Sequence, residues 1–273
     1  MSAPPSPTLD RRALADLAEA VARRSGRLLL DGLHRHRTLV ETKSTGTDMV
    51  SEMDWASEQL IVAALLASRP DDGVVGEEGS AVAGTSGLRW VIDPLDGTTN
   101  YLYAIPGWGV SIAAETAEGV VAGVVFDPVH DQLFRATAGG GASCNGEPIA
   151  ASPITDLGLA LVATGFGYHP DRRRAQAEVL AGLIGDIRDI RRIGAAAVDL
   201  CSVACGRVDA FYERGLQWWD LAAGGLIAIE AGAVVVSLDG DGPPLPGSVL
   251  AAAPGIANPL RERLSALRAG DVP

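Results

Sequence analysis

The sequence predicts a mixed α/β protein in which sheets are covered by helices. Two long segments before residue 70 carry apolar residues at helical spacing, and short Val- and Ile-rich runs separated by Gly or Asp follow between residues 74 and 136. The second half alternates strand-like and helix-like segments, a pattern typical of sheets packed beneath helical layers. With 273 residues, 47% of them hydrophobic, the chain suits one large unit or two closely packed lobes.

Two helices are expected at the N-terminal end. Ser6 and Pro7 resemble an N-cap and first-turn pair, and leucines and valines recur at near-helical spacing between residues 14 and 28. Ser51, followed three residues later by Asp54, resembles a capping box, and the apolar pattern after it continues to Pro70. These signals predict a first long amphipathic helix and a second helix that ends before Pro70.

A meandering sheet is expected next, followed by a lobe of alternating elements. Asn145-Gly146 favours a hairpin turn. We place a lobe boundary near residue 150, so that residues 1–150 form one lobe and residues 151–273 the other. The first lobe should hold strands at 74–75, 90–92, 110–113, 120–126 and 133–136. The second should hold strands at 159–163, 187–190, 211–212 and 234–238, and helices at 171–184, at 196–205, after Asp220 and at 258–268.

The composition argues against several classes of partner and location. A formal net charge of −12 leaves no overall positive field, so neither nucleic acid nor a membrane surface is expected as a partner. The N-terminus shows no basic start followed by an apolar run, and no stretch of about eighteen uncharged apolar residues occurs. The three cysteines lack a CxxC pair and cannot all form disulfides. We therefore expect a cytoplasmic protein.

The segment WVIDPLDGTTNY at 90–101 carries the strongest chemical signal. An apolar strand runs directly into Asp93 and Asp96, which flank Pro94 and Leu95. Mg²⁺ prefers oxygen ligands, and two carboxylates on a proline-restricted turn can converge on one ion while a backbone carbonyl between them supplies another oxygen. The competing interpretation is an Asp-Gly turn with solvated carboxylates.

Two separated motifs resemble the signatures of the inositol monophosphatase family, which belongs to the lithium-sensitive, magnesium-dependent sugar phosphatases. DPLDGTTNY at 93–101 resembles D-P-[IL]-D-G-T-x-N-[FY], and WDLAAG at 219–224 resembles W-D-x-A-[AG]-G. The resemblance spans roughly residues 40 to 255. It extends to Lys43 with Asp54, to Gly76-Glu77-Glu78, to Gly194-Ala195-Ala196 and to Tyr212-Glu213-Arg214-Gly215.

The resemblance implies a five-layered α-β-α-β-α sandwich of two lobes, usually a homodimer, with the site between the lobes. It also implies two or three Mg²⁺ ions per site. Their ligands would be Glu77, Asp93, the backbone oxygen of Leu95, Asp96 and Asp220. Four carboxylates gathered this closely would repel one another strongly unless cations neutralised them. Taken alone, Glu77 could be a charged residue at a strand end, and Asp220 could be a helix cap.

The same resemblance implies that a water molecule activated by the metal attacks phosphorus directly, without a covalent phosphoenzyme. Glu77 and Thr98 would orient this water, and Asp54 and Lys43 would lie behind Thr98 and polarise its hydroxyl. The alternative for Lys43 and Asp54 is a surface ion pair and a helix cap. Substrate contacts would come from Asp96, Gly97, Thr98, Gly194, Ala196, Glu213 and Asp220.

The expected reaction is hydrolysis of a sugar or cyclitol monophosphate, with inositol 1-phosphate as the leading candidate. Fructose 1,6-bisphosphate, histidinol phosphate and nucleotide bisphosphates remain alternatives, as does a regulatory protein that retains the metal site. The loop Thr164-Gly165-Phe166-Gly167-Tyr168 resembles the bacterial form of the family, and Gln217 stands where several animal relatives carry His. These departures leave the identity of the sugar open.

Overall fold

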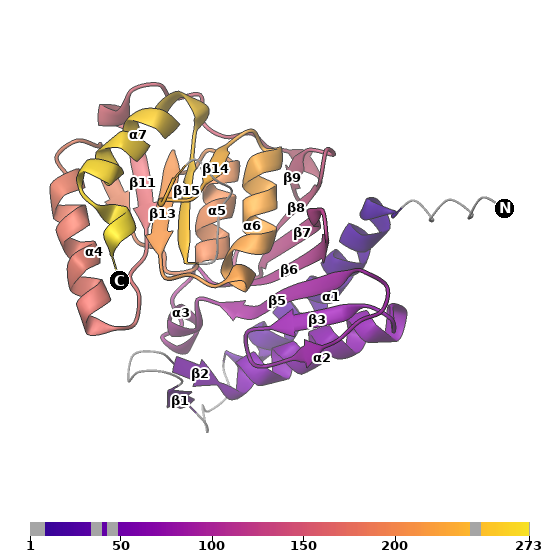
Figure 1. The fold of residues 1–273 in the computed structure, drawn as a ribbon. Helices are drawn as coiled ribbons and strands as arrows, with labels where there is room; N and C mark the ends of the chain where they lie inside the picture. The colour runs from indigo at the N-terminus through magenta and orange to yellow at the C-terminus, as the bar shows by residue number, and fades with distance from the viewer. Residues whose placement is uncertain (1–8, 34–39, 43–48, 241–246, 273) are drawn as a thin grey trace.

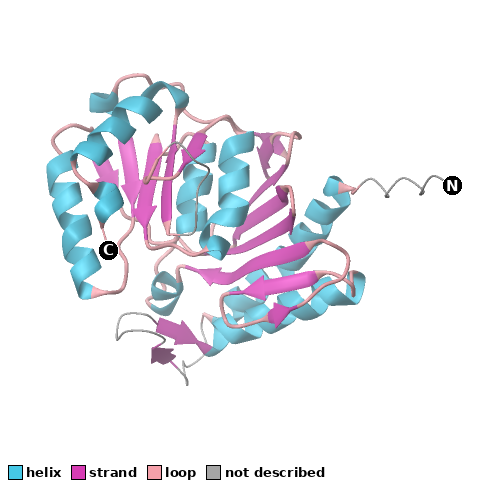
Figure 2. Cartoon of the chain, in the orientation of Figure 1, coloured by secondary structure: helices cyan, strands magenta, loops and turns pink. Residues whose placement is uncertain are grey.

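The structure is a computed structural model that describes residues 9–33, 40–42, 49–240 and 247–272. These residues form five layers, with helices and sheets alternating through the molecule (Figures 1 and 2). Helices α1 (Arg11–Gly32) and α2 (Glu52–Ser68) cover the outer face of an eight-stranded sheet. Helices α5 (Ala196–Ala204) and α6 (Trp218–Glu230) lie between that sheet and a five-stranded one. Helices α4 (Pro170–Leu183) and α7 (Pro254–Ala266) cover the far face of the five-stranded sheet. This order of layers confirms the predicted α-β-α-β-α sandwich.

The eight-stranded sheet is a meander in which all neighbours are antiparallel except β3 and β5. Asn145 and Gly146, with φ of 50° and 86°, form the turn between β9 and β10, which confirms the predicted hairpin. The strands run in the order β10-β9-β8-β7-β6-β5-β3-β4. Their bounds are β3 (Gly73–Gly76), β4 (Ala81–Val82), β5 (Arg89–Asp96), β6 (Gly109–Thr116), β7 (Gly119–Asp127), β8 (Gln132–Thr137), β9 (Ala142–Cys144) and β10 (Glu147–Pro148).

The five-stranded sheet contains a strand that the sequence did not predict. Strand β15 (Ser248–Ala252) pairs antiparallel with β13 (Ala210–Arg214) and with β14 (Val234–Val236). On the other side of β13, β11 (Leu161–Thr164) and β12 (Asp189–Arg191) are parallel. A separate two-stranded ribbon joins β1 (Val40–Thr42) to β2 (Met49–Ser51).

Three hydrophobic clusters hold these layers together. One lies between α1, α2 and the large sheet and includes Ile61 and Trp90. The second fills the space between the two sheets around α5 and α6, and every residue of α5 is buried there. The third joins the small sheet to α4 and α7. Because α5 and α6 are buried on both sides, their N-termini are held in fixed positions, which matters for the site described below.

Several helix ends differ from the expectation. Helix α1 begins at Arg11 and is capped by Asp10, whose side chain accepts from the amides of Arg12 and Ala13 at 3.1 Å. Ser6 and Pro7 lie outside the described residues. Helix α6 begins before Asp220, at Trp218, and α7 begins at Pro254 rather than at residue 258. The capping box of α2 is confirmed, since the amide of Ser51 donates to Asp54 at 2.8 Å.

Two short helical turns complete the described elements, at Leu157–Leu159 and Ala269–Asp271. Within the described residues, no helix combines the length and the apolar character that spanning a membrane requires.

Candidate metal and phosphate site

A bulge at the end of β5 brings Asp93 and Asp96 together. On β5 these residues are three positions apart, but their partners on β6, Ser111 and Gly109, are only two positions apart. Residues i and i+3 of a regular strand point to opposite faces, and one extra residue reverses that relation. Pro94 lies within the bulge, where its missing N–H removes no regular ladder bond. Both carboxylates therefore reach the same side of the sheet.

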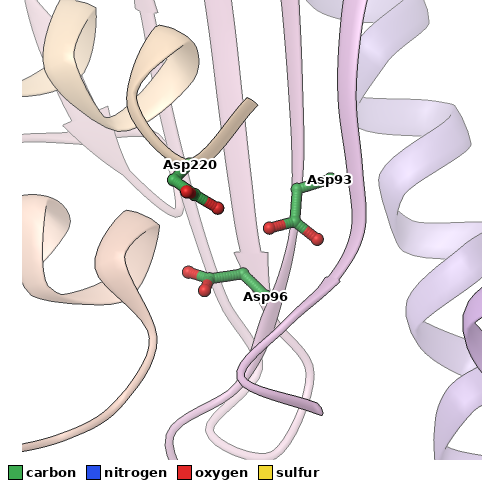
Figure 3. Close-up of side chains that lie close together, drawn as sticks. All are labelled: Asp93, Asp96 and Asp220. Carbon is green, nitrogen blue, oxygen red and sulfur yellow. The ribbon is translucent and has the colours of Figure 1, made fainter. Parts of the chain in front are cut away.

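Asp220 joins these two carboxylates from α6. Oxygen atoms of Asp93, Asp96 and Asp220 all lie within 4.8 Å of one another. Figure 3 shows the three side chains converging from the strand end and from the start of the helix. Asp93 and Asp96 are buried, and Asp220 is half-buried. The residues come from both sides of residue 150, so the arrangement depends on the two halves of the chain packing together.

Helix N-termini hold two of the three carboxylates. Asp96 accepts from the amides of Ala196 and Ala197, at 3.2 and 2.7 Å, in the first turn of α5. The N-cap residue of α5, Ala195, has no side chain that can accept from the first amides of the helix. Asp96, from the other half of the chain, supplies the missing acceptor. Asp220 is the third residue of α6 and accepts from the amide of Gln217 at 2.6 Å in a capping box.

Glu77 follows directly after β3 and lines the same cavity as the three aspartates. Its amide donates to the carbonyl of Ile92 on β5 at 3.2 Å, which fixes the backbone of Glu77 beside the strand that carries Asp93. Its side chain forms a hydrogen bond with that of Asp93. Glu77 is therefore a fourth carboxylate at this site.

Burial and mutual repulsion shift the protonation of the cluster. Burial raises the pKa of Asp93 well above 3.8, and the nearby carboxylates, first that of Glu77, raise it further. Burial also raises the pKa of Asp96 to about 7; the amide of Ala197 opposes this shift, and Glu77 adds to it. The pKa of Asp220 rises for the same reasons, burial first and then Glu77. Without a cation, the cluster therefore lacks the positive charge that would stabilise its ionised carboxylates.

Thr98 and Asp54 form a hydrogen-bonded pair beside the cluster. Thr98, the first residue of α3 (Thr98–Leu102), donates from Oγ1 to Asp54 Oδ1 at 2.8 Å and lies 3.1 Å from the backbone oxygen of Leu95. Asp54 is fully buried, and its other oxygen accepts from the hydroxyl of Ser51 at 2.5 Å. Burial raises the pKa of Asp54, while the bonds from Ser51 and Thr98 lower it. Lys43 lies outside the described residues.

The carboxylates open into a cavity of about 610 Å³, within the range of roughly 300–1,000 Å³ usual for small-molecule sites. Gly97, Thr98, Gly194, Ala196 and Glu213 line it, so the structure brings the described residues expected at the substrate site together around one space. Gly97 and Gly194 have φ of 91° and 97°, a left-handed backbone that glycine adopts without strain.

Glu213, expected at the substrate site, is accompanied by charged neighbours that the sequence did not reveal. Burial raises the pKa of Glu213 to about 8, and Arg192 opposes this shift. Arg172 and Arg192 line the cavity, and the buried Asp199 interacts with both Glu213 and Arg192. Arg172, Arg192 and Asp199 belong to no motif. Arg172 lies on α4, Asp199 lies on α5, and Arg192 follows β12 directly. No local pattern in the sequence could have identified them.

The donor atoms at this site fit a hard divalent cation. All of them are oxygens: four carboxylates from Glu77, Asp93, Asp96 and Asp220, and the carbonyl of Leu95 within the bulge. Mg²⁺ prefers this donor type, and positive charge would relieve the repulsion that raises the pKa values of the aspartates.

Comparison with known proteins identifies the family. The model of the inositol monophosphatase family matches residues 10–271. The chain belongs to the inositol monophosphatase family. Members of this family are phosphatases, and this protein is a phosphoric monoester hydrolase.

Individual relatives agree with this assignment. The chain is 45% identical over 231 residues to the inositol-1-monophosphatase of Mycobacterium leprae, a match that covers 81% of this chain and 79% of that protein. It is 38% identical over 254 residues to the Nus factor SuhB of Pasteurella multocida, covering 92% and 95% of the two chains. The crystal structure of the extragenic suppressor protein suhB from Bartonella henselae superposes with a TM-score of 0.88 at 35% identity, covering 92% and 98%.

Proposed function

We propose that this phosphatase hydrolyses a sugar or cyclitol monophosphate in a Mg²⁺-dependent reaction, with inositol 1-phosphate as the leading candidate substrate. The observation that carries the proposal is the cavity itself, in which an all-oxygen carboxylate cluster faces a polar wall that includes Glu213. The name inositol-1-monophosphatase, given to the Mycobacterium leprae relative, supports the choice of substrate.

The residues proposed to hold two or three Mg²⁺ ions are Glu77, Asp93, the backbone oxygen of Leu95, Asp96 and Asp220. When bound, Mg²⁺ would neutralise the substrate phosphate and lower the pKa of a coordinated water molecule. A cation is needed because a phosphate dianion would otherwise meet four carboxylates in a chain that already carries a net charge of −12.

Thr98 is proposed to orient the attacking water. Its hydroxyl donates to Asp54 at 2.8 Å, so a lone pair on Oγ1 can accept a hydrogen bond from a water molecule in the cavity. Glu77 lines the same cavity, and its carboxylate can accept a hydrogen bond from the other O–H of that water. Lys43 is proposed to support Asp54 and Thr98, as the family resemblance implies.

The lobe of residues 151–273 is proposed to recognise the polyol and that of residues 1–150 to supply most of the metal ligands. Gly97 and Thr98 would contact the phosphate together with Asp96 and Asp220. Gly194 and Ala196 would approach the ring through their backbone, and Glu213 would exchange hydrogen bonds with ring hydroxyls. A Glu213 pKa of about 8 leaves its carboxyl group mostly protonated at neutral pH, so it can both donate and accept there.

Phosphate release from a substrate panel tests the proposal. Inositol 1-phosphate, fructose 1,6-bisphosphate, histidinol phosphate and a nucleotide bisphosphate would be assayed with Mg²⁺, with excess chelator and with Li⁺. We expect Mg²⁺-dependent, Li⁺-inhibited turnover that is fastest with inositol 1-phosphate. Full activity in chelator would refute the metal-dependent reaction, and a faster rate with another member of the panel would reassign the substrate.

A regulatory role is a second candidate, because several relatives that match most of this chain are named Nus factors. The two candidates assign different roles to the carboxylates. A phosphatase needs them for catalysis, whereas a protein that acts only through partner contacts does not. Purified protein that binds Mg²⁺ but releases phosphate from none of the panel would favour the regulatory role. A homodimer is also proposed, and analytical ultracentrifugation would test it.

A further inference from the structure

Helix α2 buries a polar face beneath the site. Asp54, Ser57 and Glu58 occupy positions i, i+3 and i+4, which lie on one side of a helix. Their side chains are 0%, 0% and 3% exposed, although polar residues at this spacing normally face solvent. Each contacts a different segment of the candidate site. Asp54 binds Thr98, as described above, whereas Ser57 contacts the bulge of β5 and Glu58 contacts the turn after β3.

Glu58 holds the turn that presents Glu77. Its Oε2 accepts from the amide of Glu78 at 2.8 Å, and its Oε1 accepts from the amide of Ser80 at 2.9 Å. The amide of Glu77 itself is bound to β5. The turn is therefore fixed between β5 on one side and α2 on the other, and both oxygens of a buried carboxylate are used to fix it.

The approach of Glu58 to this turn depends on Gly76. A Cβ atom added at Gly76 would overlap the carboxylate of Glu58. That carboxylate is buried and bound to two amides, so it has no free space into which to move. Gly76 thus permits the close contact between the helix and the turn.

Ser57 supports the bulge between Asp93 and Asp96. Its hydroxyl donates to the carbonyl of Pro94 at 2.8 Å, and the hydroxyl of Ser25 on α1 lies 2.5 Å from it. Both serines are fully buried. The carbonyl of Pro94 lies inside the bulge, where the regular pairing of β5 with β6 is interrupted, and Ser57 supplies a donor for it.

From this arrangement we infer that Ser57 and Glu58 are positioning residues that set the cation affinity of the site without touching the cation. Glu58 acts through Glu77, and Ser57 acts through the backbone between Asp93 and Asp96. Partners that orient metal ligands typically change metal affinity or activity by roughly 10- to 100-fold when they are replaced. The inference rests on the proposed Mg²⁺ site, and it assigns the buried face of α2 to that site.

The test replaces Glu58 with Gln, which keeps the volume of the side chain. One amide oxygen can still accept a hydrogen bond, but the amide nitrogen would face a backbone N–H instead of accepting from it. We expect the dissociation constant for Mg²⁺, measured by calorimetry, and the Mg²⁺ concentration for half-maximal phosphate release each to rise roughly tenfold. KM for the phosphate ester at saturating Mg²⁺ should change by less than about threefold.

Three further variants separate positioning from stability. Gly76→Ala should reproduce the loss of Mg²⁺ affinity, because it displaces Glu58 from the turn. Ser57→Ala should also weaken Mg²⁺ binding, through the bulge. Ile61→Val is the matched control: Ile61 is fully buried one turn further along α2 and contacts none of the site segments through a hydrogen bond in the described structure. It should lower the melting temperature without changing Mg²⁺ affinity.

The outcomes distinguish this inference from the proposed function. Wild-type protein that neither binds Mg²⁺ nor releases phosphate would overturn both. Wild-type protein that does both, alongside a Glu58→Gln variant with unchanged Mg²⁺ affinity, would overturn the inference alone. Equal losses in Glu58→Gln and Ile61→Val at matched stability would also overturn it, because the effect would then follow stability and not the turn.

Discussion

Replacing Asp96 with Asn should stabilise the metal-free protein at alkaline pH. Burial raises the pKa of Asp96 from 3.8 to about 7, with the amide of Ala197 opposing and Glu77 adding to the shift. A carboxyl group with a higher pKa in the native protein than in the unfolded chain holds more protons when native. The native protein therefore loses stability as the pH rises between about 4 and about 7. Asn carries no charge and adds no such loss.

The size of the effect follows from the pKa difference and from one lost hydrogen bond. The difference between 3.8 and about 7 corresponds to about 4 kcal/mol of destabilisation once Asp96 is fully ionised. Asn keeps an oxygen for the amide of Ala197, at 2.7 Å, but gives up the bond from Ala196, at 3.2 Å, which contributes about 1 kcal/mol. The net gain of about 3 kcal/mol corresponds to roughly 6–12 °C in melting temperature.

Scanning calorimetry in excess chelator tests this prediction by comparing the melting temperatures of the variant and the wild type at two pH values. Near pH 8 the variant should melt above the wild type. Well below pH 3.8 it should melt slightly below the wild type, because the carboxyl group is then largely neutral in both states and only the hydrogen bond differs. Added Mg²⁺ should raise the melting temperature of the wild type more than that of the variant. A variant that melts below the wild type at both pH values would refute the electrostatic account of the cluster.

Three further predictions concern the reaction. Asp93→Asn should lower kcat by roughly 10³-fold, about 4 kcal/mol in the activation barrier, and near-normal phosphate release would place the active site elsewhere. Asp54→Asn should lower kcat by roughly 10²-fold or more while calorimetry shows Mg²⁺ affinity close to wild type, because Asp54 binds Thr98; equal losses in both quantities would refute that division of roles. Glu213→Ala should raise KM for inositol 1-phosphate roughly 10- to 100-fold and leave a simple aryl phosphate nearly unaffected. Equal losses with the two substrates would mean that Glu213 supports the structure of the site and does not recognise the sugar.

Local signals in the sequence were sufficient to predict the elements that carry the carboxylates. The apolar run before Asp93 indicated a strand that ends in acidic residues, and the Ser51–Asp54 spacing indicated the start of α2. Both depend on neighbours within a few residues. The sequence also indicated that a helix follows Asp220, although α6 begins three residues earlier than expected, because Asp220 completes a capping box with Gln217.

Other features could not be predicted because they depend on contacts between distant segments. Strand β15 is buried along its whole length, so it lacks the alternation of apolar and polar residues that marks a half-buried strand. Glu58 resembles part of the exposed face of an amphipathic helix, and only the turn after β3, about twenty residues away, makes its burial favourable. Helix α7 begins at Pro254, four residues before the expected start, and it continues through Pro259 inside the helix.

The bulge in β5 has a consequence for moving this chemistry to another protein. The four letters D-P-L-D specify two converging carboxylates only where the backbone holds one residue more than its neighbouring strand. Copied onto a regular strand, the same letters would send one carboxylate into the core and the other away from it. A designer would have to graft the irregular pairing with β6 together with the side chains, or space the two aspartates at i and i+2.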